Sequence, residues 1–250
     1  MPKLIFFDTE TTGNEQKDFL IQIAYKTAVS AQGSDKPKEN ESFVGLYKPE
    51  IKIPPEASAV HHITNKMVFD KSSLKESADL LKIKKLFEDK DSIVVAHNAP
   101  FDLLMIKKEG IEPKKFICTL KLARYLDPEE QIGRYNLQYL RYLLDFDIEA
   151  QAHDAMGDVL VLEKLFDRLK NKLIEQEKIS EGEAIKRMIE ISSHPLLIKT
   201  LNFGKYKGKK IEEVLKIDRG WLKWLLGEKE KSDVIEHEDW IYTLKYYLEK

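Results

Sequence analysis

The chain has 250 residues, enough for a sizeable core and for one domain with a small second one. Its content of 42% hydrophobic and 34% charged residues is that of an ordinary soluble protein. Its net charge of −2 excludes a globally basic surface, so any contact with nucleic acid must be local or carried by metal ions. The single cysteine, Cys118, excludes an internal disulfide. The sequence shows no signal-peptide pattern and no apolar run near the ~18 residues that a membrane helix needs. We therefore expect a cytoplasmic protein.

The first predicted element is a buried strand that ends in two carboxylates. Residues 4–7 are four large apolar residues in a row, Asp8 and Glu10 follow them, and Gly13 marks a turn. Side chains alternate along a strand, so Asp8 and Glu10 share a face. Two adjacent carboxylates repel each other unless a proton or a cation lies between them, and a divalent cation fits oxygen ligands. The alternative is that this pair only solvates a strand end in a chain with 43 acidic residues.

The elements that follow predict a mixed sheet with helices on its faces. Two more strands, over residues 19–25 and 43–47, are joined by a turn over residues 31–40 and should form an antiparallel meander with the first strand. Later strands alternate with helices, which indicates an α/β fold. These later elements are, in chain order, a loop or short helix over 59–64, a helix over 75–88, a strand over 92–96, a helix from Pro100 to Gly110, a strand over 115–118, helices over 119–125 and 136–144, and a long helix that starts near His153.

Two later elements carry further acidic residues. Asp102 starts the helix after strand 92–96, and Asp158 lies in the first turn of the long helix, five residues after His153. Functional groups gather at one edge of an open α/β sheet, and four carboxylates there suit two Mg²⁺ or Mn²⁺ ions about 3.5–4 Å apart. A neutral histidine nearby would take a proton from the attacking water. The alternative is that Asp102 and Asp158 only stabilise helix starts and that His153 lies on the surface before a helix cap.

Three segments resemble, in this order, the three motifs of the DEDDh 3′–5′ exonucleases, a family that includes the proofreading subunit of bacterial DNA polymerase III. They are Phe-Phe-Asp-Thr-Glu-Thr-Thr-Gly (6–13), His-Asn-Ala-Pro-Phe-Asp (97–102) and His-Asp-Ala-Met-Gly-Asp (153–158). Residues 59–64 are similar to a Val-His-Gly-Ile-Thr segment of those subunits, with His62 in place of the usual glycine. The resemblance covers roughly residues 3–170. It implies a ribonuclease-H-like fold with a five-stranded mixed sheet, and two-metal release of 5′-mononucleotides from a free 3′ end.

The resemblance also implies a role for each matching residue. Asp8 would bridge both metal ions, Glu10, Asp102 and Asp158 would complete their coordination, and His153 would be the general base. The residues implied to contact the terminal nucleotide or to shape its pocket are Thr11, Thr12, His61, Ile63, His97, Asn98 and Phe101. Simpler roles stay open for several of them: turn chemistry for the two threonines, loop packing for His61 and Ile63, helix capping for Asn98 and core packing for Phe101.

The C-terminal part is predicted to be a separate small module. Residues 199–210 hold five lysines and no acidic residue, and residues 201–227 resemble a module at the C-terminus of exodeoxyribonuclease X-like proteins. We expect this module to hold nucleic acid through Lys205, Lys207 and Lys209 and through aromatic stacking; the alternative is a solvated lysine turn. The predicted organisation is an exonuclease domain over residues 1–170, a helical connector over 171–198 and a small α+β module over 199–250.

The predicted function is that of a Mg²⁺-dependent 3′–5′ exonuclease that acts in DNA repair. Its expected substrate is single-stranded or duplex DNA with a free 3′ end, and a polymerase or repair complex is a further partner that the resemblance allows. The first alternative is the same reaction on small RNAs, because features that sense a 2′-hydroxyl are not legible in the sequence. The second is a non-catalytic nucleic-acid-binding module, which would need none of the four carboxylates or His153.

Overall fold

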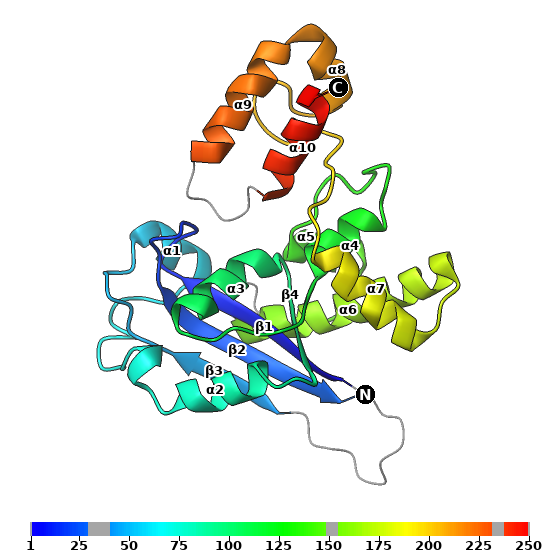
Figure 1. The fold of residues 1–250 in the computed structure, drawn as a ribbon. Coiled ribbons are helices and arrows are strands. Elements are labelled where there is room, and N and C mark those ends of the chain that lie inside the picture. The colour runs from blue at the N-terminus through cyan, green and yellow to red at the C-terminus, as the bar shows by residue number, and fades with distance from the viewer. Residues whose placement is uncertain (1, 30–40, 149–154, 232–237, 250) are drawn as a thin grey trace.

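The computed structural model describes residues 2–29, 41–148, 155–231 and 238–249 (Figure 1). The turn predicted over residues 31–40 and the predicted general base His153 therefore lie outside the described residues. None of the described helices combines the length and the apolarity that crossing a bilayer requires.

A five-stranded mixed sheet forms the centre of the N-terminal domain, which the sequence predicts to be an exonuclease domain, and the sheet is confirmed. Its strands stand in the order β3-β2-β1-β4-β5, with β1 in the middle. The strands β1 to β3 form the predicted antiparallel meander, and β4 and β5 extend the sheet in parallel with β1. The strand bounds are β1 Lys3–Thr11, β2 Leu20–Val29, β3 Ser42–Leu46, β4 Ser92–Ala96 and β5 Phe116–Cys118. This arrangement confirms the ribonuclease-H-like fold.

The helices connect these strands and build the C-terminal part. Their bounds are α1 Pro55–His61, the 3-10 turn η1 Leu74–Glu76, α2 Asp79–Phe87, α3 Ala99–Lys108, α4 Thr119–Tyr125, α5 Leu137–Leu143, α6 Ala155–Glu177, α7 Glu181–Ser192, α8 Ile211–Ile217, α9 Arg219–Lys231 and α10 Glu238–Glu249. The helix predicted over residues 75–88 is confirmed as α2 over residues 79–87, but its predicted start is wrong, because the chain is extended at Ser77, between η1 and α2. The hydroxyl of Ser77 accepts a hydrogen bond from the backbone N–H of Asp79 at 3.2 Å, which offers this backbone an alternative to a continuous helix.

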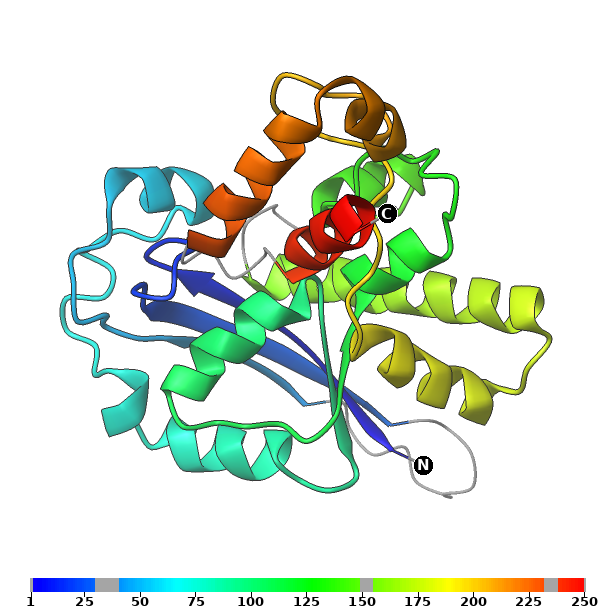
Figure 2. The ribbon, with the colours of Figure 1, turned by 45° about the horizontal axis from the view of Figure 1, so that its top comes forward.

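Alternation along β1 decides which side chains meet which helices. Phe6 faces α6, where its ring lies edge-on to Phe166 with the ring centroids 5.2 Å apart. Ile5 and Phe7 face the opposite side, which α2 and α3 cover. Figure 2 shows the two helix layers on either side of the sheet. The same period of two places Asp8 and Glu10 on the α6 side, where that helix begins.

The segment predicted as a connector is helical but forms part of the exonuclease domain's core. Leu173, Ala184 and Met188 are buried in the same hydrophobic cluster as Phe6. The hydroxyl of Ser192, at the end of α7, accepts a hydrogen bond from the N–H of Cys118 on β5 at 2.8 Å. From this packing we propose a boundary close to residue 193 in place of the predicted one at 170.

The C-terminal module has a hydrophobic core of its own. Its helices α8, α9 and α10 enclose Leu201, Ile211, Leu222 and Leu244, and one antiparallel bridge joins Thr200 to Lys210. In Figure 1 the module stands beyond one end of the sheet, in orange and red. It therefore lies beside the exonuclease domain and does not extend its sheet.

Candidate active site

Three of the four predicted metal ligands lie together where β1 passes the start of α6. Asp8 and Glu10 come from β1 and Asp158 comes from the first turn of α6. Each offers a carboxylate oxygen, and these oxygens lie within 4.8 Å of one another. Asp158 is buried, whereas Asp8 and Glu10 are half-buried. The cluster is thus open to solvent on one side.

The chemistry of these donors fits a divalent cation. Three carboxylates at this spacing repel one another unless positive charge or protons lie between them. Oxygen-only ligands of this kind suit hard cations such as Mg²⁺ and Mn²⁺. The residues present therefore match the cofactor that the sequence predicts.

The fourth carboxylate, Asp102, is tied to the cluster through Thr9. Asp102 is buried in the first turn of α3 and, among the described residues, does not belong to the group of oxygens above. One of its oxygens, Oδ1, accepts hydrogen bonds from the N–H of Thr9 at 3.1 Å and from the Thr9 hydroxyl at 2.6 Å. Because Thr9 stands between Asp8 and Glu10, Asp102 fixes the part of β1 that carries them.

Two glutamines that the motifs do not include contact the first turn of α6. The side-chain amide of Gln138, on α5, donates a hydrogen bond to Oδ1 of Asp158. The side-chain oxygen of Gln22, on β2, accepts one from the N–H of Ala155 at the start of α6 at 3.4 Å. Both contacts join residues that are far apart in the sequence, and no local pattern signals either of them.

A cavity of about 580 Å³ opens beside β1 and collects four of the residues predicted to contact the terminal nucleotide. It is lined by Glu10 together with Thr11, Thr12, His61 and Phe101. The two threonine hydroxyls act in the turn itself, since that of Thr11 donates to the carbonyl of Gly13 at 2.6 Å and that of Thr12 donates to Asp18 at 2.9 Å. Their side chains thus perform the turn chemistry that was the simpler alternative.

The other residues predicted to shape the nucleotide pocket lie elsewhere. Ile63 is buried against Ile21 and Ile53, so it packs in a small core below α1. His97 and Asn98 line a different cavity, described below. The backbone of Asn98 is left-handed and its side chain makes no capping hydrogen bond, so the alternative role of a simple cap does not apply.

The structure explains why a glycine is usual at the position of His62. This residue ends α1 with a φ of 61°, in the left-handed region. Glycine adopts this conformation without steric cost, and histidine is among the non-glycine residues that tolerate it more often than most. The substitution therefore preserves the backbone turn that carries His61.

His97 is held in one tautomer by its two neighbours. Its Nε2 lies 2.7 Å from the carbonyl oxygen of Tyr135, which only accepts, so Nε2 carries the proton. Its Nδ1 lies 2.9 Å from the hydroxyl of Thr119 and accepts from it. Desolvation lowers the pKa of His97 to about 4, because the charged imidazolium loses water there.

Acid should therefore destabilise the protein through His97. Below pH 6.5 the unfolded chain binds a proton at this imidazole while the folded chain binds it only near the lowered pKa of about 4. The stability that the neutral ring contributes is complete above pH 6.5 and is lost as the pH falls toward 4, up to about 3 kcal/mol. Urea unfolding across this range should show a shallower loss for His97→Gln than for the wild type. Equal slopes for the two proteins would contradict the assignment.

Thr9→Val should lower the rate of the DNA hydrolysis that the sequence predicts about tenfold, because Asp102 loses one of its two donors from β1 while the volume of the side chain is kept. Thr9→Ser, which keeps the hydroxyl, should restore most of the rate. Thr27→Val is the matched control, since Thr27 is also a buried, hydrogen-bonded threonine of the same sheet but lies on β2. The measurement is kcat for each variant. An equal loss of kcat in the two valine variants would mean that Thr9 matters only for folding.

A family model described as "Exonuclease" matches residues 5–166, the part of the chain that holds the acidic cluster and all of the sheet except the first two residues of β1. The chain belongs to the exonuclease family. The predicted enzyme class, a 3′–5′ exonuclease, is thereby confirmed, and so is the family resemblance of the three motifs. A second model, described as "Exodeoxyribonuclease X-like C-terminal", matches residues 201–230 and confirms the resemblance of the module.

Several characterised exonucleases and polymerase subunits are similar to this exonuclease. Exodeoxyribonuclease 10 of Escherichia coli (strain K12) is 30% identical over 247 residues, which are 98% of this chain and 99% of that protein. DNA polymerase III subunit epsilon of Treponema pallidum (strain Nichols) is 31% identical over 169 residues, 64% of this chain and 73% of the subunit. Among solved structures, Exonuclease X in complex with 5′ overhanging duplex DNA superposes with a TM-score of 0.56 at 25% identity, covering 76% of this chain and 99% of that one.

Proposed function

We propose that this exonuclease removes nucleotides from the 3′ ends of DNA and that two Mg²⁺ or Mn²⁺ ions are bound by Asp8, Glu10, Asp102 and Asp158. The observation that supports this most strongly is the cluster of carboxylate oxygens within 4.8 Å of one another. The full-length similarity to a protein named exodeoxyribonuclease 10 supports DNA as the substrate.

Each part of the site has a task in hydrolysis. The bound cations would activate a water molecule and neutralise the charge that develops on the phosphate. Asp8 and Glu10 are fixed on one face of a central strand, and Gln138 orients Asp158. His153 would take a proton from the attacking water on an imidazole nitrogen and later release it to solvent. The upstream 3′ oxygen would take a proton from solvent when its bond to phosphorus breaks. The product is a 5′-mononucleotide.

The cavity beside β1 is the proposed site of the terminal nucleotide. Because the hydroxyls of Thr11 and Thr12 are engaged in the turn, these two lining residues would contact the nucleotide through their backbone groups. His61 and Phe101 line the same cavity. Ile63 would act indirectly, since its backbone N–H donates to Nδ1 of His61 at 3.0 Å and holds that ring.

We place the enzyme in DNA repair in the cytoplasm, a reducing compartment in which the buried free thiol of Cys118 persists. The similarity to proteins named DNA polymerase III subunit epsilon supports a polymerase or repair complex as a partner.

Labelled substrates test the proposed activity directly. A single-stranded DNA, its blunt duplex and an RNA of the same sequence, each labelled at the 3′ end, are incubated with Mg²⁺ and then with a chelator. We expect the label to be released faster from DNA than from RNA, and as a mononucleotide. We expect the chelator to stop the reaction. Equal or faster loss from RNA would favour the exoribonuclease alternative. Absence of hydrolysis on every substrate would favour a binding module.

A further inference from the structure

A second cavity lies between the exonuclease domain and the C-terminal module, and we propose that it binds the phosphodiester backbone of the DNA substrate. This inference rests on the proposed function and adds a site to it. The cavity holds about 640 Å³, within the roughly 300–1,000 Å³ of ligand-binding pockets. The residues that define this interdomain cleft are Arg124, Glu130 and Arg134 of the exonuclease domain and Asn202, Lys207 and Gly208 of the module.

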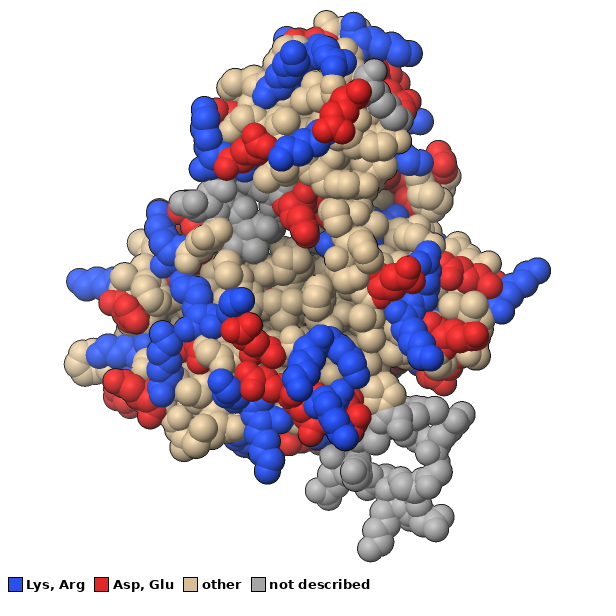
Figure 3. All heavy atoms as spheres, viewed as in Figure 1, with Lys and Arg blue, Asp and Glu red and all other residues tan. Residues whose placement is uncertain are grey.

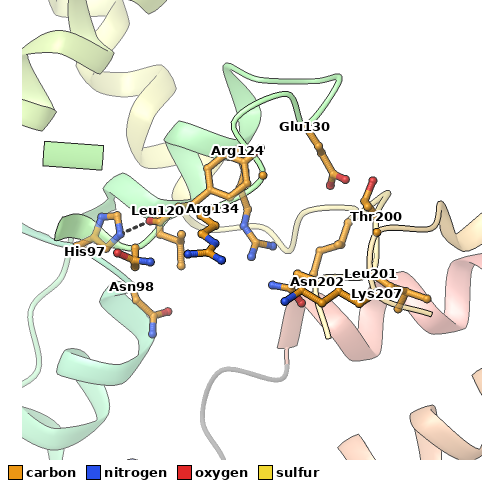
Figure 4. A pocket seen from close by; sticks show the side chains of 15 residues that line it. His97, Asn98, Leu120, Arg124, Glu130, Arg134, Thr200, Leu201, Asn202 and Lys207 are labelled. Atoms are coloured by element: carbon orange, nitrogen blue, oxygen red, sulfur yellow. Dashed lines mark hydrogen bonds between the residues drawn. The ribbon is translucent and has the colours of Figure 1, made fainter. Parts of the chain in front are cut away.

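Positive charge from both sides converges on the interdomain cleft. Figure 4 shows the guanidinium groups of Arg124 and Arg134 pointing toward Asn202 and Lys207. In the part of the chain that the structure describes, no carboxylate lies within 4.0 Å of the charged nitrogens of Arg124, Arg134 or Lys207. Glu130 is the one carboxylate among the described lining residues, and its Oε1 accepts a hydrogen bond from the N–H of Lys199 at 2.7 Å. The cleft is therefore cationic in a chain whose net charge is −2.

Two arginines of the cleft have guanidinium groups that aromatic rings hold in an orientation suited to binding phosphate. The guanidinium of Arg124 lies 5.4 Å from the ring centre of Tyr135, and that of Arg134 lies 6.0 Å from the ring centre of Tyr139. Stacking on an aromatic ring orients a guanidinium and leaves its edge free to donate to an anion. On the face shown in Figure 3, basic and acidic side chains are interspersed over both domains, so no broad basic surface on that face competes with the cleft.

Hydrogen bonds and an ion pair join the two walls of the cleft at two places. Lys199 joins them near Glu130, because its Nζ also donates to the carbonyl of Pro128 at 2.6 Å. Lys121 joins them at a second place, since its buried ammonium donates to the carbonyl of His194 at 3.0 Å and lies 3.2 Å from a carboxylate oxygen of Glu238 on α10. A cleft braced in this way needs little reorganisation to receive a strand.

Two structural elements connect the interdomain cleft with the active site. Asn98 lines the cleft and immediately precedes α3, whose first turn carries Asp102. Asn136 lines it as well and caps α5, whose Gln138 donates to Asp158. A strand whose 3′ end is held at the acidic cluster would therefore meet the cations of the cleft a short way along its backbone.

The three lysines of the module that were predicted to bind nucleic acid differ in their surroundings. Nζ of Lys205 lies 3.2 Å from a carboxylate oxygen of Asp218 and over the ring of Tyr206, so its charge is already compensated. Lys207 lines the cleft, whereas Lys209 does not. The proposal therefore assigns the main phosphate contact of the module to Lys207, together with Arg134 from the opposite wall.

Binding measurements on matched variants test the cleft. Arg134→Gln, Lys207→Gln and the double variant are compared with Arg168→Gln on α6 and Lys216→Gln on α8, two exposed charges that do not line it. Affinity for a fluorescent single-stranded DNA is measured in chelator, without cleavage, over a series of salt concentrations. We expect each cleft variant to raise Kd about five- to tenfold and to reduce the slope of log Kd against log salt by about 0.7. The control variants should change Kd less than twofold, and Lys207→Arg should bind like the wild type.

The outcomes separate this inference from the proposed function. If the wild type cleaves DNA and the cleft variants bind it as the controls do, the cleft proposal is wrong and the exonuclease proposal stands. If the wild type cleaves no DNA but binds it, and the cleft variants weaken that binding with the expected salt slope, the cleft proposal stands and the proposed activity is wrong. Equal weakening by cleft and control variants would overturn the cleft proposal, because it would reflect overall charge alone.

Discussion

Asp8→Asn should reduce Mg²⁺-dependent hydrolysis of DNA about a thousandfold or more, because removing one anionic ligand forfeits several kcal/mol of charge stabilisation in the transition state. The amide has the shape of the carboxylate, and the backbone pairing of Asp8 with Ala24 across β1 and β2 is unaffected. The measurement is the single-turnover rate of release of a 3′-terminal label at saturating enzyme. Melting temperature and circular dichroism are recorded beside it.

A structural role for Asp8 would give a different result. In chelator, the variant should melt no lower than the wild type, because it relieves repulsion among three clustered carboxylates. Asp167→Asn is the matched control, since Asp167 is an exposed carboxylate of α6 outside the cluster, and it should keep the full rate. More than a tenth of the wild-type rate in Asp8→Asn, or a low rate explained by unfolding, would contradict the metal-site proposal.

His153→Gln should lower kcat about 10²- to 10⁴-fold, the usual contribution of a general base. Unlike Asp8→Asn, this variant keeps all of the carboxylates. Its affinities for Mg²⁺ and for DNA should therefore stay unchanged. The rate of the wild type should rise with pH on the acidic side of its profile as the imidazole loses its proton, and the variant should lack that limb. The measurement is kcat against pH, with Kd for DNA determined in parallel.

His194→Gln serves as the control for His153, because the ring of His194 lies on the surface at the end of α7, away from the cluster. It should reproduce the wild-type profile. A loss of Mg²⁺ affinity in His153→Gln that matched its loss of rate would assign His153 to metal binding and remove it as the base. An unchanged kcat would remove it from the reaction altogether.

The fold was predictable wherever a local pattern decides the structure. The apolar run before Asp8 could only be a buried strand, and its period of two places Phe6, Asp8 and Glu10 on one face. The strand over residues 92–96 and the helix over residues 119–125 have the predicted bounds for the same reason. The break at Ser77 was not predictable, because the apolar spacing continues across it and only a side-chain hydrogen bond favours the extended residue.

The sequence was enough to predict which residues form the site, but not which hydrogen bonds and ion pairs join them. Motif spacing identified the carboxylates, but the hydrogen bond from Thr9 to Asp102 spans 93 residues and has no local signal. Likewise, the lysine-rich turn of the module is visible in the sequence, whereas its division into the compensated Lys205 and the cleft-lining Lys207 depends on where Asp218 and Arg134 lie. Tertiary contacts of this kind follow from the packing of elements and leave no trace in composition or periodicity.

Anomalous diffraction from crystals of this exonuclease soaked in Mn²⁺ shows directly whether these carboxylates bind a divalent cation. We expect anomalous density between the carboxylates of Asp8, Glu10 and Asp158, and its loss in Asp8→Asn crystals soaked in the same way. Enzyme that cleaves DNA in Mn²⁺ while its crystals show no anomalous density at these carboxylates would contradict the account.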